Sequence, residues 1–303
     1  MKMLSVITPC FNESENLRVC IESLVDALPG IEYEHVFIDN FSTDSTLKDL
    51  IELKKEFPHL RILSNSQNVG VFSSIQRALR ESDGEWVVPF FAADLQDPAE
   101  VIRQMISIQK NSNCDSVFAI RETRSENPMI FLLRRIFYGI IRRTTDKAYV
   151  SGTSEFCLIK ASVASQVSQI DDANPFLRLY LSQLRGDVRY VKFAMKERIR
   201  GKSSANLFSL MDDALNAFSI VLPSVFSRIL ISSFIGILAG TSVCFFTLLD
   251  LLFLPFNLEK LFTPALLMVG FSSLIALNAL IGQYVYIIHS NVRKRLTAST
   301  TEI

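Results

Sequence analysis

Two long apolar runs without a charged residue constrain the fold of this chain more than any other feature. Residues 229–249 and 261–288 contain no Asp, Glu, Lys or Arg. A helix needs about 20 apolar residues to cross the hydrocarbon core of a bilayer, and each run is that long. Buried helices of a large soluble core are the alternative, but two such runs joined by a short loop are unusual there. We therefore predict a membrane region at residues 227–290 with two transmembrane helices, at about residues 229–252 and 262–288.

The charges around these runs predict their orientation. The loop between them carries Asp250, Glu259 and Lys260, whereas the basic run Arg-Lys-Arg at residues 293–295 follows the second. The positive-inside rule then places the tail, residues 291–303, in the cytoplasm. Two crossings return the chain to its starting side, so we expect a multi-pass protein of the inner membrane whose N-terminal part is also cytoplasmic.

Composition narrows the class of the remaining chain. Lys+Arg and Asp+Glu are equal at 31 each, so we expect no nucleic-acid partner. The hydrophobic fraction of 49% and the mean hydropathy of +0.27 are high for a soluble protein, and the excess lies mainly beyond residue 220. The five cysteines are scattered without ligand spacing, which favours reduced thiols over a disulfide framework or a zinc site. Residues 1–6 lack the apolar core of a signal peptide.

Short apolar runs alternate with helical patterns through the first half of the chain. The expected strands are residues 4–8, 35–39, 60–64, 86–91 and 116–120, and the expected helices are residues 15–27, 45–57, 71–82 and 99–110. Ser14 and Asp44 are expected N-caps. This repetition predicts an α/β domain with a mostly parallel sheet and right-handed crossovers. Ligands of such sheets bind at the carboxyl ends of the strands, where residues 9–13, Asp39 and Asp94 fall.

Two further segments have an amphipathic pattern. Residues 129–143 combine bulky apolar side chains with four arginines, as a helix in the lipid headgroup layer does. An ordinary helix packed on the sheet is the alternative. Residues 206–226 carry Asp212 and Asp213 on a polar side, and we expect a juxtamembrane helix along the bilayer surface.

Three segments of the chain together resemble one enzyme family. They are VITPCFNE at residues 6–13, FIDNFSTDST at residues 37–46 and AADLQDP at residues 92–98. This set is similar to the inverting family 2 glycosyltransferases with a GT-A fold, and within them to polyprenyl-phosphate glycosyltransferases of the dolichol-phosphate mannose synthase and bactoprenol glucosyltransferase type. The likeness continues through RIRGKS at residues 198–203 and GQYVY at residues 282–286, so it covers nearly the whole chain.

The resemblance implies a GT-A, Rossmann-like catalytic domain at residues 1–205. It also implies a UDP-sugar donor, a polyprenyl (undecaprenyl) phosphate acceptor and a homo-oligomer, by resemblance a tetramer. Its donor residues would be Pro9, Phe11, Glu13, Asp39, Asp94 and Arg198. A carboxylate such as that of Asp39 can accept a hydrogen bond from a ring N–H of uracil, and a turn-capping role is the alternative.

The acidic motif implies a metal ion. In the family it holds Mg²⁺ or Mn²⁺ with a following glutamine, so Asp94 and Gln96 are the implied ligands, and the ion neutralises the leaving diphosphate. Many relatives have an acid at the position of Ala92. Its loss predicts weaker metal binding or recruitment of Asp97, although we expect Asp97 to lie at the surface before Pro98.

Glu155 is the second implied catalytic residue, after Asp94. It stands where relatives have an aspartate proposed as a base. A phosphate monoester has a second pKa of about 6, so a lipid phosphate is already a nucleophilic anion at neutral pH. Glu155 is therefore expected to orient the acceptor or donor, and a structural role is the alternative.

Basic side chains are needed to meet the donor diphosphate and the acceptor phosphate. The residues expected in this role are Arg121, Arg124, Arg200, Lys202 and, as a hydroxyl donor, Ser203. The last three lie with Arg198 on a loop that could close over the phosphates. Relatives often have a lysine where this chain has Ser204. A solvated basic surface is the alternative for all of them.

We therefore predict an inverting, metal-dependent transferase that moves a sugar from UDP to a polyprenyl phosphate, for modification of a cell-envelope glycan. A processive polysaccharide synthase would need more spans and a Gln-x-x-Arg-Trp motif, and the single tryptophan, Trp86, lies in a strand. A non-catalytic GT-A scaffold or sugar-lipid binder is the remaining alternative, which the departures at Ala92, Glu155 and Ser204 favour. The motifs leave the sugar, the acceptor length and the final glycan open.

Overall fold

The computed structural model describes residues 4–121, 153–170, 186–195, 207–253, 261–292 and 300–303. The chain divides into two compact units. The first, called the head unit here, comprises Met1–Met211 and Arg295–Ile303, and the second, the helical unit, comprises Asp212–Lys294.

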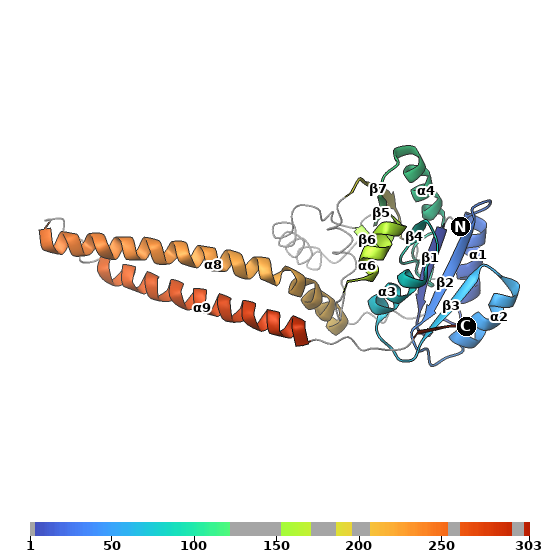
Figure 1. The fold of residues 1–303 in the computed structure, drawn as a ribbon, viewed down its shortest axis with the longest axis horizontal. Helices are drawn as coiled ribbons and strands as arrows, with labels where there is room; N and C mark the ends of the chain where they lie inside the picture. Colours follow the sequence, from blue (N-terminus) through green and yellow to red (C-terminus); the bar gives the residue numbers. More distant parts are fainter. Residues whose placement is uncertain (1–3, 122–152, 171–185, 196–206, 254–260, 293–299) are drawn as a thin grey trace. The chain divides into compact units, whose positions relative to one another are not determined.

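The described strands of the head unit form one sheet (Figure 1). They are β1 Leu4–Cys10, β2 Tyr33–Asp39, β3 Leu60–Asn65, β4 Trp86–Val88, β5 Ser116–Arg121, β6 Thr153–Lys160, β7 Val188–Phe193 and β8 Thr300–Glu302. Their order is β7-β5-β6-β4-β1-β2-β3-β8. The β1–β2, β2–β3, β1–β4 and β5–β7 pairs are parallel, whereas β6 and β8 run antiparallel to their neighbours. The mostly parallel α/β sheet confirms the predicted fold class.

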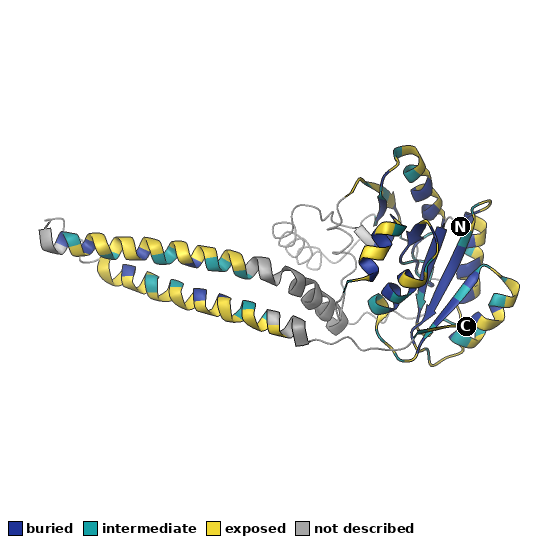
Figure 2. Cartoon of the chain, in the orientation of Figure 1, coloured by how far each residue is buried: buried dark blue, intermediate teal, exposed yellow. Residues whose placement is uncertain are grey.

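Helices cover both faces of this sheet. They are α1 Leu17–Ala27, α2 Thr46–Glu56, α3 Val71–Glu81, α4 Glu100–Ser112 and α6 Ala161–Ser168. Successive residues of a strand point to opposite faces, so Val6 of β1 packs in the core under α1, α2 and α4, while Ile7 packs in the core under α3 and α6. Burial on both faces explains why these strands are continuous apolar runs, dark blue in Figure 2.

Three strands lie outside the sequence prediction. Strand β6 is inserted antiparallel between β4 and β5, and β7 lies beyond β5. Strand β8 belongs to the segment predicted as a basic tail, and it pairs antiparallel with β3. The predicted fourth strand, residues 86–91, is shorter than expected because β4 ends at Val88.

A buried ion pair between Glu34 and Arg61 lies near the amino-terminal ends of β2 and β3. The Glu34 side chain is fully buried and accepts hydrogen bonds from the Ser5 hydroxyl at 2.5 Å, the Asp83 N–H at 2.7 Å and Arg61 at 3.0 Å. Burial acts to raise the pKa of Glu34, but these donors together hold it below its ordinary value. A carboxylate with a lowered pKa stabilises the fold above its unfolded pKa, and this contribution is lost on acidification.

Replacing Arg61 with methionine is expected to lower the free energy of unfolding by about 3 kcal/mol at neutral pH, because Glu34 would stay buried without its cation. The loss should shrink as Glu34 becomes protonated in acid. Trp86 is the single tryptophan and is buried in the sheet, so its fluorescence reports unfolding of the head unit. Arg18→Met is the control, because Arg18 pairs with Glu56 on the surface and should change little. Equal effects of both variants would contradict the buried-pair argument.

Two long helices follow, α8 Leu207–Phe253 and α9 Phe262–Val292. The helical unit contains α9 and the part of α8 from Asp212 onward. Residues 207–226, expected as a separate juxtamembrane helix, continue without a break into α8. The segments Phe226–Asp250 and Phe262–Tyr286 are long and apolar enough to cross a membrane. Their large apolar side chains are mostly exposed (yellow in Figure 2), for example Leu238 at 70%.

Small residues bring α8 and α9 close together within this unit. A Cβ atom at Gly240 would lie 2.6 Å from a methyl carbon of Val269 and 3.0 Å from the Ala265 carbonyl oxygen. Gly236, one turn earlier, faces Ser272. Glycines four residues apart are typical of closely packed helices in membranes.

Candidate active site at the carboxyl ends of the strands

The first part of the site is where β1 and β2 end side by side. Cys10 pairs with Asp39, and the Asn40 N–H donates to the Cys10 carbonyl at 2.9 Å. Beyond the strands, the Asn12 N–H donates to the Ser42 hydroxyl at 3.0 Å. These bonds join residues 9–13 and 39–46 into one surface, which we call the donor edge. The structure thus brings together the predicted residues Pro9, Phe11, Glu13 and Asp39.

Asp39 is 2% exposed, and both of its carboxylate oxygens lie 3.3 Å from the Ser42 N–H. This is the turn-capping contact that the sequence left as an alternative. The predicted helix caps are wrong in position, because Asn16 and Ser45 occupy the N-cap positions of α1 and α2. Asp44 instead accepts the Thr46 N–H at 2.9 Å and stabilises the turn before α2.

Two aromatic side chains are exposed at the donor edge. Phe11 is 46% and Phe41 is 54% exposed. Phe41 has a φ of 65°, in the left-handed region that bulky residues rarely adopt, and Asn12 has a φ of 57°. Such strain persists only where neighbouring contacts maintain it, and it is concentrated at functional sites. Phe41 is not marked by its sequence motif, since its left-handed backbone is visible only in the structure.

The second part of the site is the acidic loop that follows β4. The Phe91 N–H donates to the Ile7 carbonyl at 2.8 Å, so the chain still follows β1 beyond the end of β4. Asp94 then accepts the Gln96 N–H at 3.2 Å, and Leu95 between them has a φ of 58°. The loop therefore turns tightly and places the predicted Asp94 and Gln96 next to each other.

Asp97 is fully buried, so the expectation that it lies at the surface is wrong. Its Oδ1 atom accepts a hydrogen bond from Nη2 of Arg121 at 3.2 Å. Among the described residues, Oδ2 of Asp97 and Nε of Arg121 have no hydrogen-bond partner, although both atoms are buried. The loop packs against the end of β5, and this packing buries a carboxylate whose polar neighbours in the sequence suggested exposure.

The pKa of Asp97 depends on burial and on the neighbouring charges of the site. Burial raises its pKa to about 6; the Arg121 charge acts against this rise, and the charges of Asp94 and Glu155 add to it. Four ionisable groups from the acidic loop, β5 and β6 therefore share one electrostatic environment. A buried carboxylate with a raised pKa beside several other charges is a sign of a functional site.

Strand β6 supplies Glu155. Thr153 of β6 pairs with Ile120 and Cys157 pairs with Phe118, with an irregular register between them, so Glu155 lies beside the end of β5. Its side chain is 7% exposed. The sequence motif marked Glu155 as a candidate, but the strand that places it near Arg121 was not predicted.

Comparison with known proteins identifies the fold and the family. The profile of Glycosyl transferase family 2 matches residues 5–167, which contain the donor edge, the acidic loop and β6. The chain belongs to this family. A bactoprenol glucosyl transferase of Shigella phage SfX is 28% identical over 221 residues, 71% of each chain. An uncharacterized glycosyltransferase of Synechocystis is 26% identical over 282 residues, 92% of this chain and 85% of that protein.

Solved structures of other glycosyltransferases share the fold. Residues 1–349 of S. aureus TarS with UDP-GlcNAc align with a TM-score of 0.51 at 20% identity, over 76% of this chain and 67% of that one. Glucosyl-3-phosphoglycerate synthase of Mycobacterium tuberculosis with Mn²⁺, UDP-glucose and phosphoglyceric acid aligns with a TM-score of 0.53 at 16% identity, over 74% and 79% of the two chains. These likenesses confirm the predicted GT-A fold of a family 2 glycosyltransferase.

The family implies a divalent metal, and the donors of the acidic loop suit one by type. Mg²⁺ and Mn²⁺ prefer oxygen ligands, which the Asp94 carboxylate and the Gln96 amide supply. The buried, unpartnered Oδ2 atom of Asp97 is a further oxygen nearby along the chain. Within the described ranges, no group of three or more His, Cys, Asp or Glu side chains is arranged to hold an ion alone. An ion here would therefore depend on phosphate oxygens and water to complete its ligands.

Several predicted residues lie outside the described part of the chain. They are Arg124, Arg198, Arg200, Lys202 and Ser203, together with the expected interfacial helix at residues 129–143. Of the predicted phosphate-binding residues, Arg121 is the one that the structure describes.

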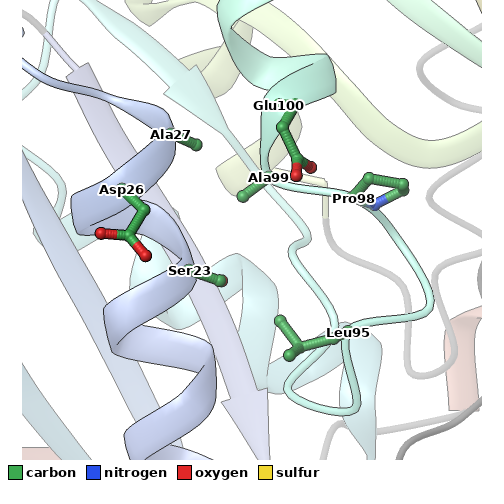
Figure 3. A pocket seen from close by; sticks show the side chains of 7 residues that line it. All are labelled: Ser23, Asp26, Ala27, Leu95, Pro98, Ala99 and Glu100. Atoms are coloured by element: carbon green, nitrogen blue, oxygen red, sulfur yellow. The ribbon is translucent and has the colours of Figure 1, made fainter.

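A separate cavity of about 250 Å³ lies between the end of α1 and the start of α4 (Figure 3). Side chains of α1 face the acidic loop across it, and its lining residues are Ser23, Asp26, Ala27, Leu95, Pro98, Ala99 and Glu100. None of them is a predicted site residue. The cavity borders the loop that carries Asp94 through Leu95, and no residue of the donor edge lines it.

Proposed function

We propose that this family 2 glycosyltransferase transfers a sugar from a UDP-sugar to a polyprenyl phosphate, with inversion at the anomeric carbon. The observation that carries the proposal is the ion pair of the buried Asp97 with Arg121, 3.2 Å apart, in the acidic loop of Asp94 at the carboxyl end of the sheet. It joins an acidic loop suited to a metal-bound diphosphate to a guanidinium suited to a second phosphate.

The donor edge would bind the nucleotide. Asp39 ends β2 with a carboxylate that can accept the N–H of uracil, and the exposed rings of Phe11 and Phe41 offer flat apolar surfaces to a base. Structural neighbours bound to UDP and UDP-sugars support this assignment. The identity of the sugar is open.

Asp94 and Gln96 would hold the divalent metal beside the diphosphate. The bound ion would supply Lewis-acid stabilisation of the charge that develops on the departing UDP. Asp97 would hold Arg121, and the basic loop with Arg198 would add further positive charge. The complexes of structural neighbours with Mn²⁺ support metal dependence.

The acceptor phosphate would be held by the Arg121 guanidinium, and Glu155 would orient the acceptor or the donor. A phosphate oxygen, already anionic at neutral pH, forms a bond to the anomeric carbon while the bond from that carbon to the UDP oxygen breaks. The electron pair of the breaking bond leaves with UDP. The phosphate itself is the nucleophile, so Glu155 is not needed as a strong base.

The helical unit and the relatives together support a lipid phosphate as the acceptor. Exposed apolar side chains along α8 and α9 are stable where lipid surrounds them. The name of the phage relative, a bactoprenol glucosyl transferase, supports a polyprenyl phosphate. Membrane attachment would confine the enzyme and its acceptor to one thin layer and raise their effective concentration. We further propose a cytoplasmic head and, by family resemblance, a tetramer.

The full chain in lipid vesicles provides the test. We expect radiolabel from one of a panel of UDP-sugars to enter the lipid extract, and this transfer should require both added polyprenyl phosphate and Mg²⁺ or Mn²⁺. Chelation by EDTA should abolish it. Binding of a UDP-sugar without transfer under these conditions would contradict the proposal and support the non-catalytic sugar-lipid binder.

A further inference from the structure

The C-terminal strand β8 is fixed to the edge of the sheet at several points. Asn65 pairs with Thr300 and Leu63 with Glu302, and the Ile303 N–H donates to the Ile62 carbonyl at 2.9 Å. The Glu302 carboxylate receives two hydrogen bonds from the Arg61 guanidinium, at 2.9 and 3.0 Å. The first residue of β8 therefore lies at the carboxyl end of β3, the end that carries the site.

Thr300 and Arg77 together hold the Asn65 side chain. The Thr300 hydroxyl donates to Oδ1 of Asn65 at 2.9 Å. Nη1 of Arg77 lies 3.2 Å from the same oxygen and 3.1 Å from the Thr300 hydroxyl. Asn65 is 2% exposed, so these contacts are made out of water and fix the orientation of its amide.

Asn65 in turn holds Asn40. Its amide nitrogen donates to the Ser74 hydroxyl at 3.0 Å and to Oδ1 of Asn40 at 3.3 Å. Oδ1 of Asn40 also accepts a hydrogen bond from the Val69 N–H at 2.9 Å. The amide nitrogen of Asn40 donates to Oδ1 of Asn68 at 2.9 Å. Both polar atoms of the Asn40 side chain are therefore engaged, and the residue is 5% exposed.

Asn40 is the residue between Asp39 and Phe41. The left-handed conformation of Phe41 costs free energy, so contacts on its neighbours must maintain it. The chain of hydrogen bonds through Asn65 and Asn40 ends at this strained position. It thus links β8 to the surface where the nucleotide is proposed to bind.

We propose that Thr300 is a positioning residue of the donor site, acting through Asn65 and Asn40 to hold Asp39 and Phe41 in the geometry that binds the nucleotide. This inference rests on the proposed function, which assigns the donor to that edge. Residues 300–303 follow both apolar helices in the sequence, so the donor site is complete only after the helical unit has been synthesised.

The test measures binding of UDP, in the presence of Mg²⁺, to the full chain in detergent by calorimetry. Thr300→Val removes the hydroxyl and keeps the shape, and we expect it to weaken UDP binding about tenfold. Thr301→Val is the matched control, because it is the same substitution on the exposed adjacent residue of β8, and we expect less than a twofold change. Thr300→Ser retains the hydroxyl and should bind like the wild type.

A kinetic measurement separates positioning from general damage. Thr300→Val should raise KM for the UDP-sugar about tenfold and leave kcat at saturating donor within about twofold, with unchanged unfolding by Trp86 fluorescence. Equal UDP affinity of Thr300→Val and the wild type would overturn the positioning role alone. If Thr300→Val loses stability, failure of Thr300→Ser to restore binding would overturn it as well. A wild-type chain that binds no UDP would overturn the proposed function and, with it, this inference.

Discussion

Asp94→Asn is expected to reduce sugar transfer by roughly 10²- to 10³-fold, because the asparagine amide cannot replace a charged metal ligand beside the diphosphate. Asp94 lies in a tight turn with Gln96, whose N–H it accepts at 3.2 Å. Asparagine can accept this hydrogen bond too, so the loop should keep its shape and Trp86 fluorescence should report unchanged unfolding. The variant therefore removes the negative charge of residue 94 and retains the conformation of the loop.

The measurement is initial-rate transfer of radiolabelled sugar into lipid over a range of Mn²⁺ concentrations. We expect the loss to be partly recovered at high Mn²⁺, since a weakened site still binds when the ion is in excess. Glu100→Gln is the control, because Glu100 is an exposed carboxylate in the first turn of α4 that lines the separate cavity. It should change the rate less than twofold. Unchanged transfer and unchanged metal dependence in Asp94→Asn would contradict the metal assignment.

The parts of the fold that follow from local pattern were predictable. Strands β1, β2, β3 and β5 are apolar runs, and the helices between them show a 3.6-residue period, so both types of element are visible in short windows of sequence. Strand β8 is not visible in this way. Its sequence, Thr-Thr-Glu, is short and polar, and it is stabilised by distant partners such as Arg61.

The site was predictable to a similar degree. Asp94, Gln96 and Asp39 belong to contiguous motifs, and the ends of parallel strands bring such motifs together. The network of Asn40, Asn65 and Thr300 contains a hydrogen bond between residues 235 positions apart, Asn65 and Thr300, and its members are ordinary in their local sequence. The burial of Asp97 likewise depends on β5, which lies some 20 residues further along the chain. Only the tertiary pairing reveals either feature.

Asp97→Asn is expected to change the pH dependence of stability as well as activity. The folded pKa of about 6 lies above the ordinary value of 3.8, so the ionised carboxylate is disfavoured in the folded chain. The wild type should therefore gain stability as the pH falls through the interval from about 6 to 4, whereas the asparagine variant should lack this gain. A shift of this size corresponds to about 3 kcal/mol at most. Unfolding followed by Trp86 fluorescence in EDTA, at pH 7.5 and pH 4.5, measures the difference.

Transfer should fall in the same variant even where stability does not. The neutral amide still accepts one hydrogen bond from Arg121 but loses the charge that holds the guanidinium, so the acceptor phosphate would be less well placed. We expect a loss of about 10- to 100-fold, seen mainly as a raised KM for polyprenyl phosphate. Asp187→Asn is the control, because Asp187 pairs with Arg189 at 3.0 Å on an exposed surface.

The two readouts test different statements about Asp97. If Asp97→Asn retains the pH dependence of the wild type, the buried carboxylate does not titrate in this interval and the electrostatic coupling is wrong. If stability responds as expected but transfer and the acceptor KM match the Asp187→Asn control, the pair is structural and Arg121 does not meet the acceptor. A fall in transfer together with a retained or increased stability at pH 7.5 would mean that the buried charge is kept at a cost in stability because catalysis needs it.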